Sequence, residues 1–329
     1  MLVVSIGCPS GVGPEVSVLA AARLRGVATV LVGDRAALDE AAELRGVSRT
    51  RLVAFDGSRP PRGRIAVLSP VPVLRSDLRR PGRPSRSAGR AQLAWIEAAL
   101  DLTRRTPGAA LVTGPVSKAA IAGSGARGAS RFTGHTEWLK TRDGARSAVM
   151  CFASPALTTS LVTTHLRLAR VPRALTPGGV RDATVALAQL LSSLGRRTPR
   201  IAVASLNPHA GESELLGDEE RRAIIPGIAA ARRMLGRRVV LQGPIGAETA
   251  YRRALARDFD GVVAMYHDQA TIPTKLVAFG DAVNVTVGLS VVRTSVDHGT
   301  GYDIAWKGVA EPGGMLAAMR LAVRLLRSA

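Results

Sequence analysis

The chain has 329 residues, of which 46% are hydrophobic, and its formal net charge is +20. A chain of this length and composition can bury a large core, which excludes a short disordered or disulfide-stabilised protein and indicates two domains or one large α/β unit. The first residues lack the pattern of a signal peptide, and no window approaches the roughly 18 apolar residues of a membrane span, so we expect a soluble protein. The two cysteines, Cys8 and Cys151, match no metal-ligand spacing and indicate a reducing compartment, the cytoplasm.

The positive charge comes almost entirely from arginine, because lysine occurs at only four positions and 41 of the 45 basic residues are arginine. The arginines are spread over the whole chain among alanine, glycine and proline, which indicates a compositional bias. Only 3% of the residues are aromatic, so few side chains are available to stack on bases. The densest basic stretch, residues 75–90, is rich in proline and serine and is typical of an exposed loop. A basic nucleic-acid-binding protein remains an alternative, which would show steeply salt-dependent binding.

Short runs rich in valine and leucine alternate with longer segments of helical periodicity, beginning at the first residues. This alternation predicts an α/β fold in which the strands are buried between helices. The predicted strands are residues 2–6, 28–32, 51–55, 64–69, 109–113, 148–153, 158–164, 201–206, 239–242, 261–265 and 283–287.

Three of the intervening helices have recognisable features. A long amphipathic helix is predicted for residues 87–104, and its sheet-facing side carries Ala91, Trp95, Ala98 and Leu102. Thr176 and Pro177 are typical of an N-cap and a first helical turn. The helix that they begin has an apolar side formed by Val180, Ala183, Leu187, Leu191 and Leu194. A further helix is expected to begin at Asp218 or Glu219.

Three of the five histidines, His165, His209 and His267, closely follow predicted strands. Ligands of open α/β sheets bind beyond the carboxyl ends of the strands, so these side chains could converge there. Three neutral imidazoles bind a zinc-like divalent ion and leave coordination positions open for substrate, as a catalytic site requires. The alternative is that each histidine caps backbone groups at the end of its strand.

Three loops could approach a charged ligand. The first, GCPSGVGPE at 7–15, would let backbone amides contact an anion, although a tight strand-to-helix turn without a ligand fits equally well. The loop TGPVSK ends in Lys118, which either presents a cation to the substrate or closes the turn after its strand. The segment DHGTGYDIAWKG at 297–308 could wrap around a nucleotide or be an ordinary loop.

Five further polar residues are candidates for substrate binding. His135 and Thr136 form an adjacent pair suited to a phosphate or carboxylate, with capping by Thr136 as the alternative. Lys275, Asn284 and Arg293 form a spaced polar set in a largely apolar region. Lysine and arginine neutralise phosphates and carboxylates, and arginine can bind them with two parallel hydrogen bonds. Solvation at the surface is the alternative for each of these three residues.

Together these loops resemble the 4-hydroxythreonine-4-phosphate dehydrogenase family of pyridoxal phosphate biosynthesis over essentially the whole chain. The matching stretches, in family order, are GCPSGVGPE, TGPVSK, FTGHTE, TTHL, LNPHAGE, MYHDQ and RTSVDHGT. The resemblance implies a two-domain fold like that of isocitrate and isopropylmalate dehydrogenases, with central mixed sheets flanked by helices. We expect residues 1–134 and 295–329 to form a discontinuous nucleotide-side domain, and residues 135–294 to form the metal, substrate and dimerisation domain.

The resemblance also assigns roles to individual residues. A divalent metal (zinc, magnesium, manganese or cobalt) is held by His165, His209 and His267, with both subunits of a homodimer contributing to each site. The substrate contacts are His135, Thr136, Lys275, Asn284 and Arg293. NAD, or NADP in its place, contacts His298, Gly299, Thr300 and Asp303.

The activity implied is oxidation of 4-phosphohydroxy-L-threonine to a 3-oxo acid, which loses carbon dioxide to give 3-amino-2-oxopropyl phosphate. No proton acceptor is identified. The chain departs from the family pattern at three places: Cys8 replaces the usual acidic residue, Trp306 stands where related nucleotide loops commonly have glycine, and the 75–90 loop is unusually basic. These departures leave room for sister dehydrogenases of phosphothreonate, phosphoerythronate or a carboxylated cis-dihydrodiol.

Overall fold

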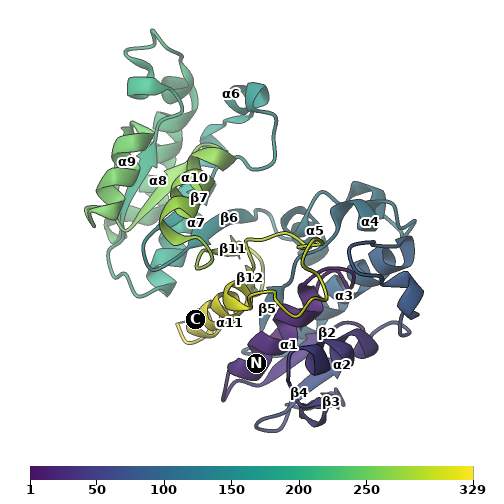
Figure 1. Ribbon diagram of the computed structural model, residues 1–329. Helices are drawn as coiled ribbons and strands as arrows, with labels where there is room; N and C mark the ends of the chain where they lie inside the picture. The colour runs from purple at the N-terminus through teal and green to yellow at the C-terminus, as the bar shows by residue number, and fades with distance from the viewer. Residues whose placement is uncertain (329) are drawn as a thin grey trace. The chain divides into compact units, whose positions relative to one another are not determined.

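The computed structural model describes residues 1–328, which form two compact units. Unit 1 consists of Met1–Arg146 with Leu289–Arg327, coloured purple to blue and yellow in Figure 1, and unit 2 contains Ser147–Gly288, coloured teal to green. The discontinuous first part was expected to end at residue 134 and to resume at 295. In the structure, residues 135–146 and 289–294 pack with unit 1, where Ser290 donates a backbone hydrogen bond to Asp143 at 2.7 Å.

Unit 1 is built on a parallel sheet in the order β3-β4-β2-β1-β5-β12. Its strands are β1 (Leu2–Ser5), β2 (Thr29–Val32), β3 (Leu52–Ala54), β4 (Ile65–Leu68), β5 (Ala110–Thr113) and β12 (Val292–Ser295). The central strands β2, β1 and β5 are buried along their whole length because helices cover both faces of a parallel sheet. The loops that begin at Ile6, Gly114 and Val296 therefore leave the sheet at its carboxyl edge.

The helices of unit 1 are α1 (Gly13–Arg23), α2 (Arg35–Leu44), α3 (Arg86–Arg105), α4 (Lys118–Ala122), α5 (His135–Asp143) and α11 (Gly313–Leu326). The predicted long helix is confirmed as α3, but its buried side is wider than predicted and is centred on Ile96, Ala99 and Leu100, with Ala98 and Leu102 only half-buried. The reason is that α3 also packs on α4. A Cβ at Gly89 would lie 2.0 Å from the Ala120 carbonyl oxygen.

Unit 2 contains a mixed sheet in the order β11-β6-β7-β10-β8-β9. Its strands are β6 (Val149–Ala153), β7 (Thr158–Leu161), β8 (Arg200–Ala204), β9 (Val240–Ile245), β10 (Gly261–Ala264) and β11 (Val283–Val287). Strands β11, β6 and β7 pair antiparallel, whereas β7, β10, β8 and β9 pair parallel. The ends of β7, β10 and β8 consequently lie along one edge of the sheet.

The helices of unit 2 are α6 (Val171–Ala174), α7 (Pro177–Ser193), α8 (Ile225–Leu235), α9 (Ala247–Leu255) and α10 (His267–Ala278). The predicted cap is confirmed, because the Thr176 hydroxyl accepts a hydrogen bond from the Gly179 amide at 3.0 Å. The helix expected from Asp218 or Glu219 begins as a π-helical turn, Glu220–Ile224, that continues into α8. No helix within residues 1–328 combines the length and the apolar character needed to cross a membrane.

Candidate functional site

A buried cation lies in the core of unit 1. Arg293, on β12, is 2% exposed and donates a hydrogen bond from Nη2 to the Thr113 hydroxyl at 2.6 Å. Burial lowers the pKa of Arg293 to about 10, and the nearby Glu137 carboxylate opposes this shift. Arginine therefore stays charged at neutral pH. A buried guanidinium is stable only where it meets compensating groups, so its position indicates a built polar site.

The first turn of α5 adds further polar groups to this cluster. His135 begins the helix, and its Nε2 is buried without a hydrogen-bond partner in the described chain, while Thr136 is buried beside it. The pKa of His135 lies well below its ordinary value because burial disfavours the imidazolium and because Arg293 and Lys118 are cationic neighbours. His135 is thus neutral near pH 7 and has a ring nitrogen available to a ligand.

Lys118 approaches the same turn. A Cβ placed on Gly134, the residue before α5, would lie 3.8 Å from the Lys118 ammonium nitrogen and 3.0 Å from a Glu137 carboxylate oxygen. Two cations, one carboxylate, the amide groups of a helix N-terminus and a neutral imidazole therefore gather within unit 1. The cations outnumber the carboxylate, and this is the chemistry of an anion site. The structure brings together three predicted substrate residues, His135, Thr136 and Arg293, and adds Lys118.

The first glycine loop and the 297–308 loop of unit 1 are hydrogen-bonded to each other. The Val12 amide donates to the Thr300 carbonyl oxygen at 2.9 Å, and a Cβ on Gly11 would lie 2.5 Å from that oxygen. The fully buried Glu15 carboxylate accepts from the Trp306 amide at 2.5 Å and from the Gly308 amide at 3.1 Å. These contacts hold the two loops in one arrangement.

Trp306 adopts a left-handed backbone conformation, with φ of +61°. This conformation favours glycine and strains other residues, which explains why a glycine suits this position in related loops. Here the indole Nε1 donates to the Pro9 carbonyl oxygen at 2.9 Å, so the side chain adds a contact that glycine lacks. The departure at Trp306 therefore strengthens the attachment of the 297–308 loop to the first glycine loop.

The other predicted nucleotide contacts have different surroundings. His298, Gly299 and Asp303 are exposed, and Thr300 is half-buried. The departure at Cys8 places its thiol 3.6 Å from the Tyr302 hydroxyl. Burial raises the pKa of Cys8 and raises the pKa of Tyr302 to about 12, so neither group carries a negative charge near pH 7.

The basic loop at 75–90 lies against the first glycine loop. The Gly82 amide donates to the Ser10 carbonyl oxygen at 2.8 Å, and a Cβ on Gly82 would lie 3.3 Å from the Tyr302 carbonyl oxygen. Arg80 and Arg83 flank this contact, and both are exposed without a hydrogen bond or ion pair from their side chains in residues 1–328. Two uncompensated cations therefore adjoin the predicted nucleotide loops.

Arg79 of the same loop is buried. Its two terminal nitrogens each approach a carboxylate oxygen of Glu40 at 2.5 Å. This paired contact holds the pKa of Glu40 below its usual value. It anchors one end of the basic loop to α2.

In unit 2, two of the predicted metal ligands lie side by side. The ring centroids of His165 and His267 are 5.5 Å apart, following the neighbouring strands β7 and β10. His267 Nδ1 lies 2.7 Å from a carboxylate oxygen of Asp268. A carboxylate that accepts from Nδ1 fixes the tautomer in which Nε2 is free to bind a metal.

The third histidine, His209, lies in a strained loop after β8. His209, Ala210 and Glu212 all have φ between +42° and +54°, a conformation that non-glycine residues rarely adopt. The buried Glu220 carboxylate holds the start of this loop by accepting hydrogen bonds from the backbone amides of Leu206 and Asn207, each at 2.9 Å. Strain of this kind concentrates at functional loops and persists only where neighbouring contacts enforce it.

No group of three or more His, Cys, Asp or Glu side chains in residues 1–328 is arranged to hold a metal ion. The structure thus brings together His165 and His267 but does not bring His209 to them within one chain. The donor chemistry of the pair, with a carboxylate behind one imidazole, fits a divalent transition metal that needs at least one more ligand.

The two remaining substrate candidates are in unit 2. Asn284, on β11, is half-buried, and its carbonyl oxygen Oδ1 is buried without a hydrogen-bond partner in the part of the chain described. A buried amide oxygen of this kind can accept a hydrogen bond from a ligand donor. Lys275 is exposed on α10.

Several residues that position the site had not been predicted from the sequence. Gln269 accepts from the Met265 amide at 2.6 Å and donates to the Ser205 carbonyl oxygen at 2.8 Å, which ties the ends of β10 and β8 together. Asp268 and Gln269 directly follow His267 in the sequence. Their position next to a candidate metal ligand is the feature by which they could have been predicted. Glu137 and Glu220 become recognisable only through contacts that the fold creates.

Comparison with known proteins gives matches along nearly the entire chain. Residues 26–322 match the family model described as pyridoxal phosphate biosynthetic protein PdxA. The chain is 40% identical over 338 residues to a 4-hydroxythreonine-4-phosphate dehydrogenase from Caulobacter vibrioides, covering 98% of this chain and 97% of that protein. The crystal structure of the enzyme of that name from Klebsiella pneumoniae is 34% identical, covers 99% of both chains and has a TM-score of 0.84.

Two other solved structures are informative. A terephthalate 1,2-cis-dihydrodiol dehydrogenase from Burkholderia xenovorans is 30% identical, covers 98% of this chain and 97% of its own, and has a TM-score of 0.68. An isocitrate dehydrogenase from Methylococcus capsulatus has a TM-score of 0.50 at 14% identity, covering 99% of this chain and 87% of its own, which shows a likeness of fold alone. The predicted fold class is confirmed.

Proposed function

This chain belongs to the pyridoxal phosphate biosynthetic protein PdxA family, and from that membership we propose that it is an NAD-dependent, metal-dependent 4-hydroxythreonine-4-phosphate dehydrogenase. The reaction oxidises the hydroxyl carbon of 4-phosphohydroxy-L-threonine and yields a 3-oxo acid that loses carbon dioxide. Both cysteines are free and buried, which supports a reducing, cytoplasmic setting.

One structural observation carries the assignment of a phosphorylated substrate: the buried, charged Arg293 lies in a cluster with the orphaned Nε2 of His135. A phosphate would accept from the guanidinium, from Lys118 and from the amides at the start of α5. Thr136 supports this role because its hydroxyl lies in the same turn. Asn284 and Lys275 complete the proposed set of substrate contacts.

We propose that His165, His209 and His267 hold the metal ion. The pairing of His165 with His267 supports this proposal, and the carboxylate of Asp268 would orient the second imidazole. When bound, the metal supplies a Lewis acid that favours loss of the proton from the substrate hydroxyl. Zinc, magnesium, manganese and cobalt all fit the donor set once substrate oxygens are added.

A homodimer would supply the ligand that one chain lacks. Each histidine loop is accompanied by large exposed apolar side chains: Leu166 and Leu168 after His165, Leu215 and Leu216 after His209, and Ile272, Leu276 and Phe279 on or after the helix that begins at His267. Leu276 is 80% exposed and Phe279 86% exposed. Apolar surface of this extent is typical of an interface. We propose that a second copy covers it, so that each metal site combines histidines from both subunits.

The nucleotide is proposed to contact His298, Gly299, Thr300 and Asp303, beside the first glycine loop. The exposed and unpaired Arg80 and Arg83 favour NADP alongside NAD, because the 2′-phosphate of NADP requires a cation. They adjoin the Tyr302 carbonyl oxygen through the turn at Gly82. The hydride leaves the substrate carbon for the nicotinamide ring.

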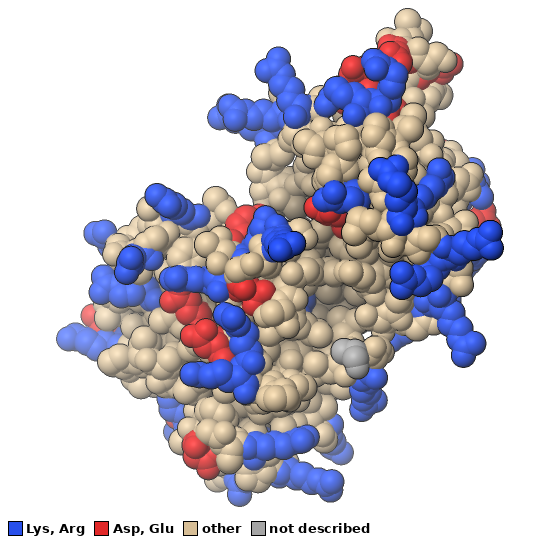
Figure 2. Space-filling view, turned by 180° about the vertical axis from the view of Figure 1, so that it is seen from behind, with Lys and Arg blue, Asp and Glu red and all other residues tan. Residues whose placement is uncertain are grey.

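The dihydrodiol dehydrogenase from Burkholderia xenovorans gives a second candidate function, because it is 30% identical to this chain. A carboxylated dihydrodiol carries no phosphate and would not need the cluster around Arg293. A nucleic-acid-binding role is less well supported. Lys and Arg side chains lie over the whole of the face shown in Figure 2 and do not gather in one stripe.

The test is NADH or NADPH formation, followed by absorbance, with 4-phosphohydroxy-L-threonine in metal-replete and chelated samples. Phosphothreonate, phosphoerythronate and a carboxylated cis-dihydrodiol serve as comparison substrates. Metal-dependent turnover that favours the first substrate supports the proposal. Preference for a comparison substrate would mean that the chain catalyses the same kind of oxidation on that substrate. The absence of turnover with all four substrates would contradict an enzymatic role of this kind.

A further inference from the structure

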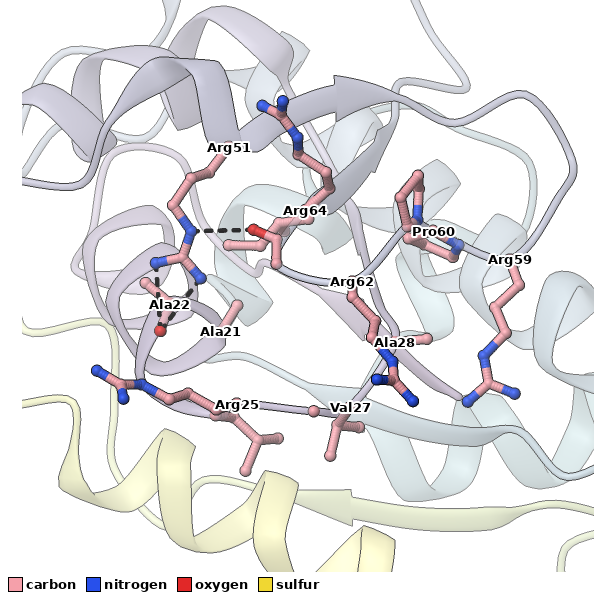
Figure 3. Close-up of a pocket in the computed structure, with 15 residues that line it drawn as sticks. Ala21, Ala22, Arg25, Val27, Ala28, Arg51, Arg59, Pro60, Arg62 and Arg64 are labelled. Carbon is pink, nitrogen blue, oxygen red and sulfur yellow. Dashed lines mark hydrogen bonds between the residues drawn. The ribbon is translucent and has the colours of Figure 1, made fainter.

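A pocket lined with arginine opens at the amino edge of the parallel sheet of unit 1 (Figure 3). Its volume is about 690 Å³, and it is formed by the segments that precede β2, β3 and β4. Its lining contains no acidic residue and includes the arginines Arg25, Arg51, Arg59, Arg62 and Arg64. The loops of the proposed phosphate and nucleotide sites leave the opposite, carboxyl edge of this sheet. The pocket is therefore separate from them.

Arg51 forms the frame of the pocket. Its Nε donates to the Gly63 carbonyl oxygen at 3.1 Å, and its two terminal nitrogens donate to the Ala22 carbonyl oxygen at 3.3 Å, as the dashed lines in Figure 3 show. One guanidinium thus joins the end of α1 to the turn before β4. Gly63 has φ of +77°, which forms the tight turn between Arg62 and Arg64.

Three other arginine side chains of the pocket have no hydrogen-bond or ion-pair partner in the part of the chain that the structure describes. Several arginines elsewhere in the structure pair with carboxylates, such as the half-buried Arg35 with Asp39 at 2.9 Å. By contrast, the side chains of Arg25, Arg59 and Arg62 make no hydrogen bond or ion pair in the part of the chain that the structure describes. Gathering like charges raises the energy of the folded chain, and a bound anion would relieve that repulsion.

The lining also restricts the kind of anion. Apart from arginine it consists of alanine, glycine, proline, valine, leucine and isoleucine, so it offers no aromatic ring on which a base could stack. Guanidinium groups bind phosphate oxygens with paired hydrogen bonds, and a pocket of this volume accommodates a small molecule. We propose that this pocket binds a small polyanion that carries two or more phosphate groups.

Calorimetric titration of the full-length protein with inorganic tripolyphosphate, at about 0.15 M ionic strength to screen diffuse attraction, tests the proposal. The variant Arg59→Gln with Arg62→Gln is expected to bind at least ~10-fold more weakly, because it loses charge-assisted hydrogen bonds. Arg237→Gln with Arg238→Gln is the matched control. Those two arginines of unit 2 are exposed, are unpaired within residues 1–328 and change the net charge equally. The control is expected to bind as the unmodified protein does.

Four outcomes would overturn the proposal. Undiminished binding by the Arg59/Arg62 variant would place the ligand elsewhere, for instance at Arg293. An equal loss in both double variants would indicate diffuse charge, and the absence of any heat of binding would exclude a site. A short single-stranded oligonucleotide that binds through Arg59 and Arg62 more tightly than tripolyphosphate would identify nucleic acid as the partner. Because these side chains are exposed, both variants should fold, and equal melting temperatures without ligand check this.

Discussion

The cluster around Arg293 in unit 1 is largely enclosed by its own unit, whereas the candidate metal ligands of unit 2 are largely open to solvent. Arg293 is 2% exposed and Thr136 is 7% exposed, and both lie beside groups supplied by unit 1. His165 and His209 are exposed, and so is Phe279, which follows the helix that begins at His267. A single chain therefore assembles the proposed phosphate cluster by itself, while it brings together only two of the three proposed metal ligands.

His209→Ala is expected to lower metal-dependent turnover at least ~1000-fold, since Lewis-acid stabilisation is worth several kcal/mol. The chain should still fold, because His209 is exposed at the end of a strand. Turnover, bound metal measured by elemental analysis and the melting temperature are compared with those of the unmodified protein. Retained turnover with normal metal content would remove His209 from the metal site.

Mixing two inactive variants sharpens the same test. If His209 meets His165 and His267 of a second subunit, a mixture of His209→Ala and His267→Ala protomers forms heterodimers with one intact site each. Random exchange between equal amounts should restore roughly a quarter of the turnover of the unmodified protein, by the two-fold symmetry of such a dimer. A mixture that stays inactive after verified exchange would show that the subunits do not share metal sites.

Arg293→Ala is expected to reduce kcat/KM for the phosphorylated substrate by about 100-fold, the loss of charge-assisted hydrogen bonds to a phosphate. Turnover of an unphosphorylated analogue should fall far less. Arg293→Lys, which keeps the charge but cannot form two parallel hydrogen bonds, is the control. Its kcat/KM for the phosphorylated substrate should lie between those of the unmodified protein and of Arg293→Ala. An equal loss with both substrates would argue against a phosphate contact, and a lowered melting temperature would reveal a structural contribution.

Arg80→Gln combined with Arg83→Gln is expected to raise KM for NADP about tenfold and to leave KM for NAD unchanged, because only NADP carries the 2′-phosphate. Kinetics with both cofactors measure this, with Arg237→Gln and Arg238→Gln as the control. If both cofactors are affected equally, the basic loop acts on the folding of the nucleotide loops and not on the choice of cofactor.

His135 predicts a dependence of stability on acid. Its folded-state pKa is depressed, so below the unfolded value of about 6.5 the unfolded chain binds a proton that the folded chain resists. Folding stability should therefore fall as pH drops from 7 to 5, by at most about 1.4 kcal/mol per pH unit from this group. His135→Asn should show a shallower decline in melting temperature. Identical pH profiles would mean that His135 is readily protonated in place.

The strands and helices of both units could be predicted from the sequence better than the contacts between their side chains. All eleven predicted strands formed, because short runs rich in valine and leucine between turn residues favour strands. Strand β12 was missed because Arg293 interrupts its apolar pattern, although this arginine is buried. The sequence also grouped three histidines, and one chain brings together two of them. A motif identifies candidate ligands, but it does not reveal how the fold arranges them.

The arginine pocket illustrates a different difficulty for sequence analysis. Arginine occurs at 41 positions, so no single arginine is conspicuous. Arg25, Arg59 and Arg62 come together only because β2, β3 and β4 enter the sheet from the same edge. Likewise, the sequence does not connect Glu220 with the His209 loop. The connection depends on the π-helical turn, which brings the Glu220 carboxylate within hydrogen-bond distance of the Asn207 amide.

Trp306 has a spectroscopic consequence. Of the three tryptophans, Trp95 is fully buried and Trp138 lies against Phe132, whereas Trp306 is fastened between the first glycine loop and the 297–308 loop. Reduced nicotinamide absorbs light in the range in which tryptophan emits. A nucleotide held by these loops would therefore quench the emission of Trp306 by energy transfer, and the chain carries its own optical reporter of cofactor occupancy.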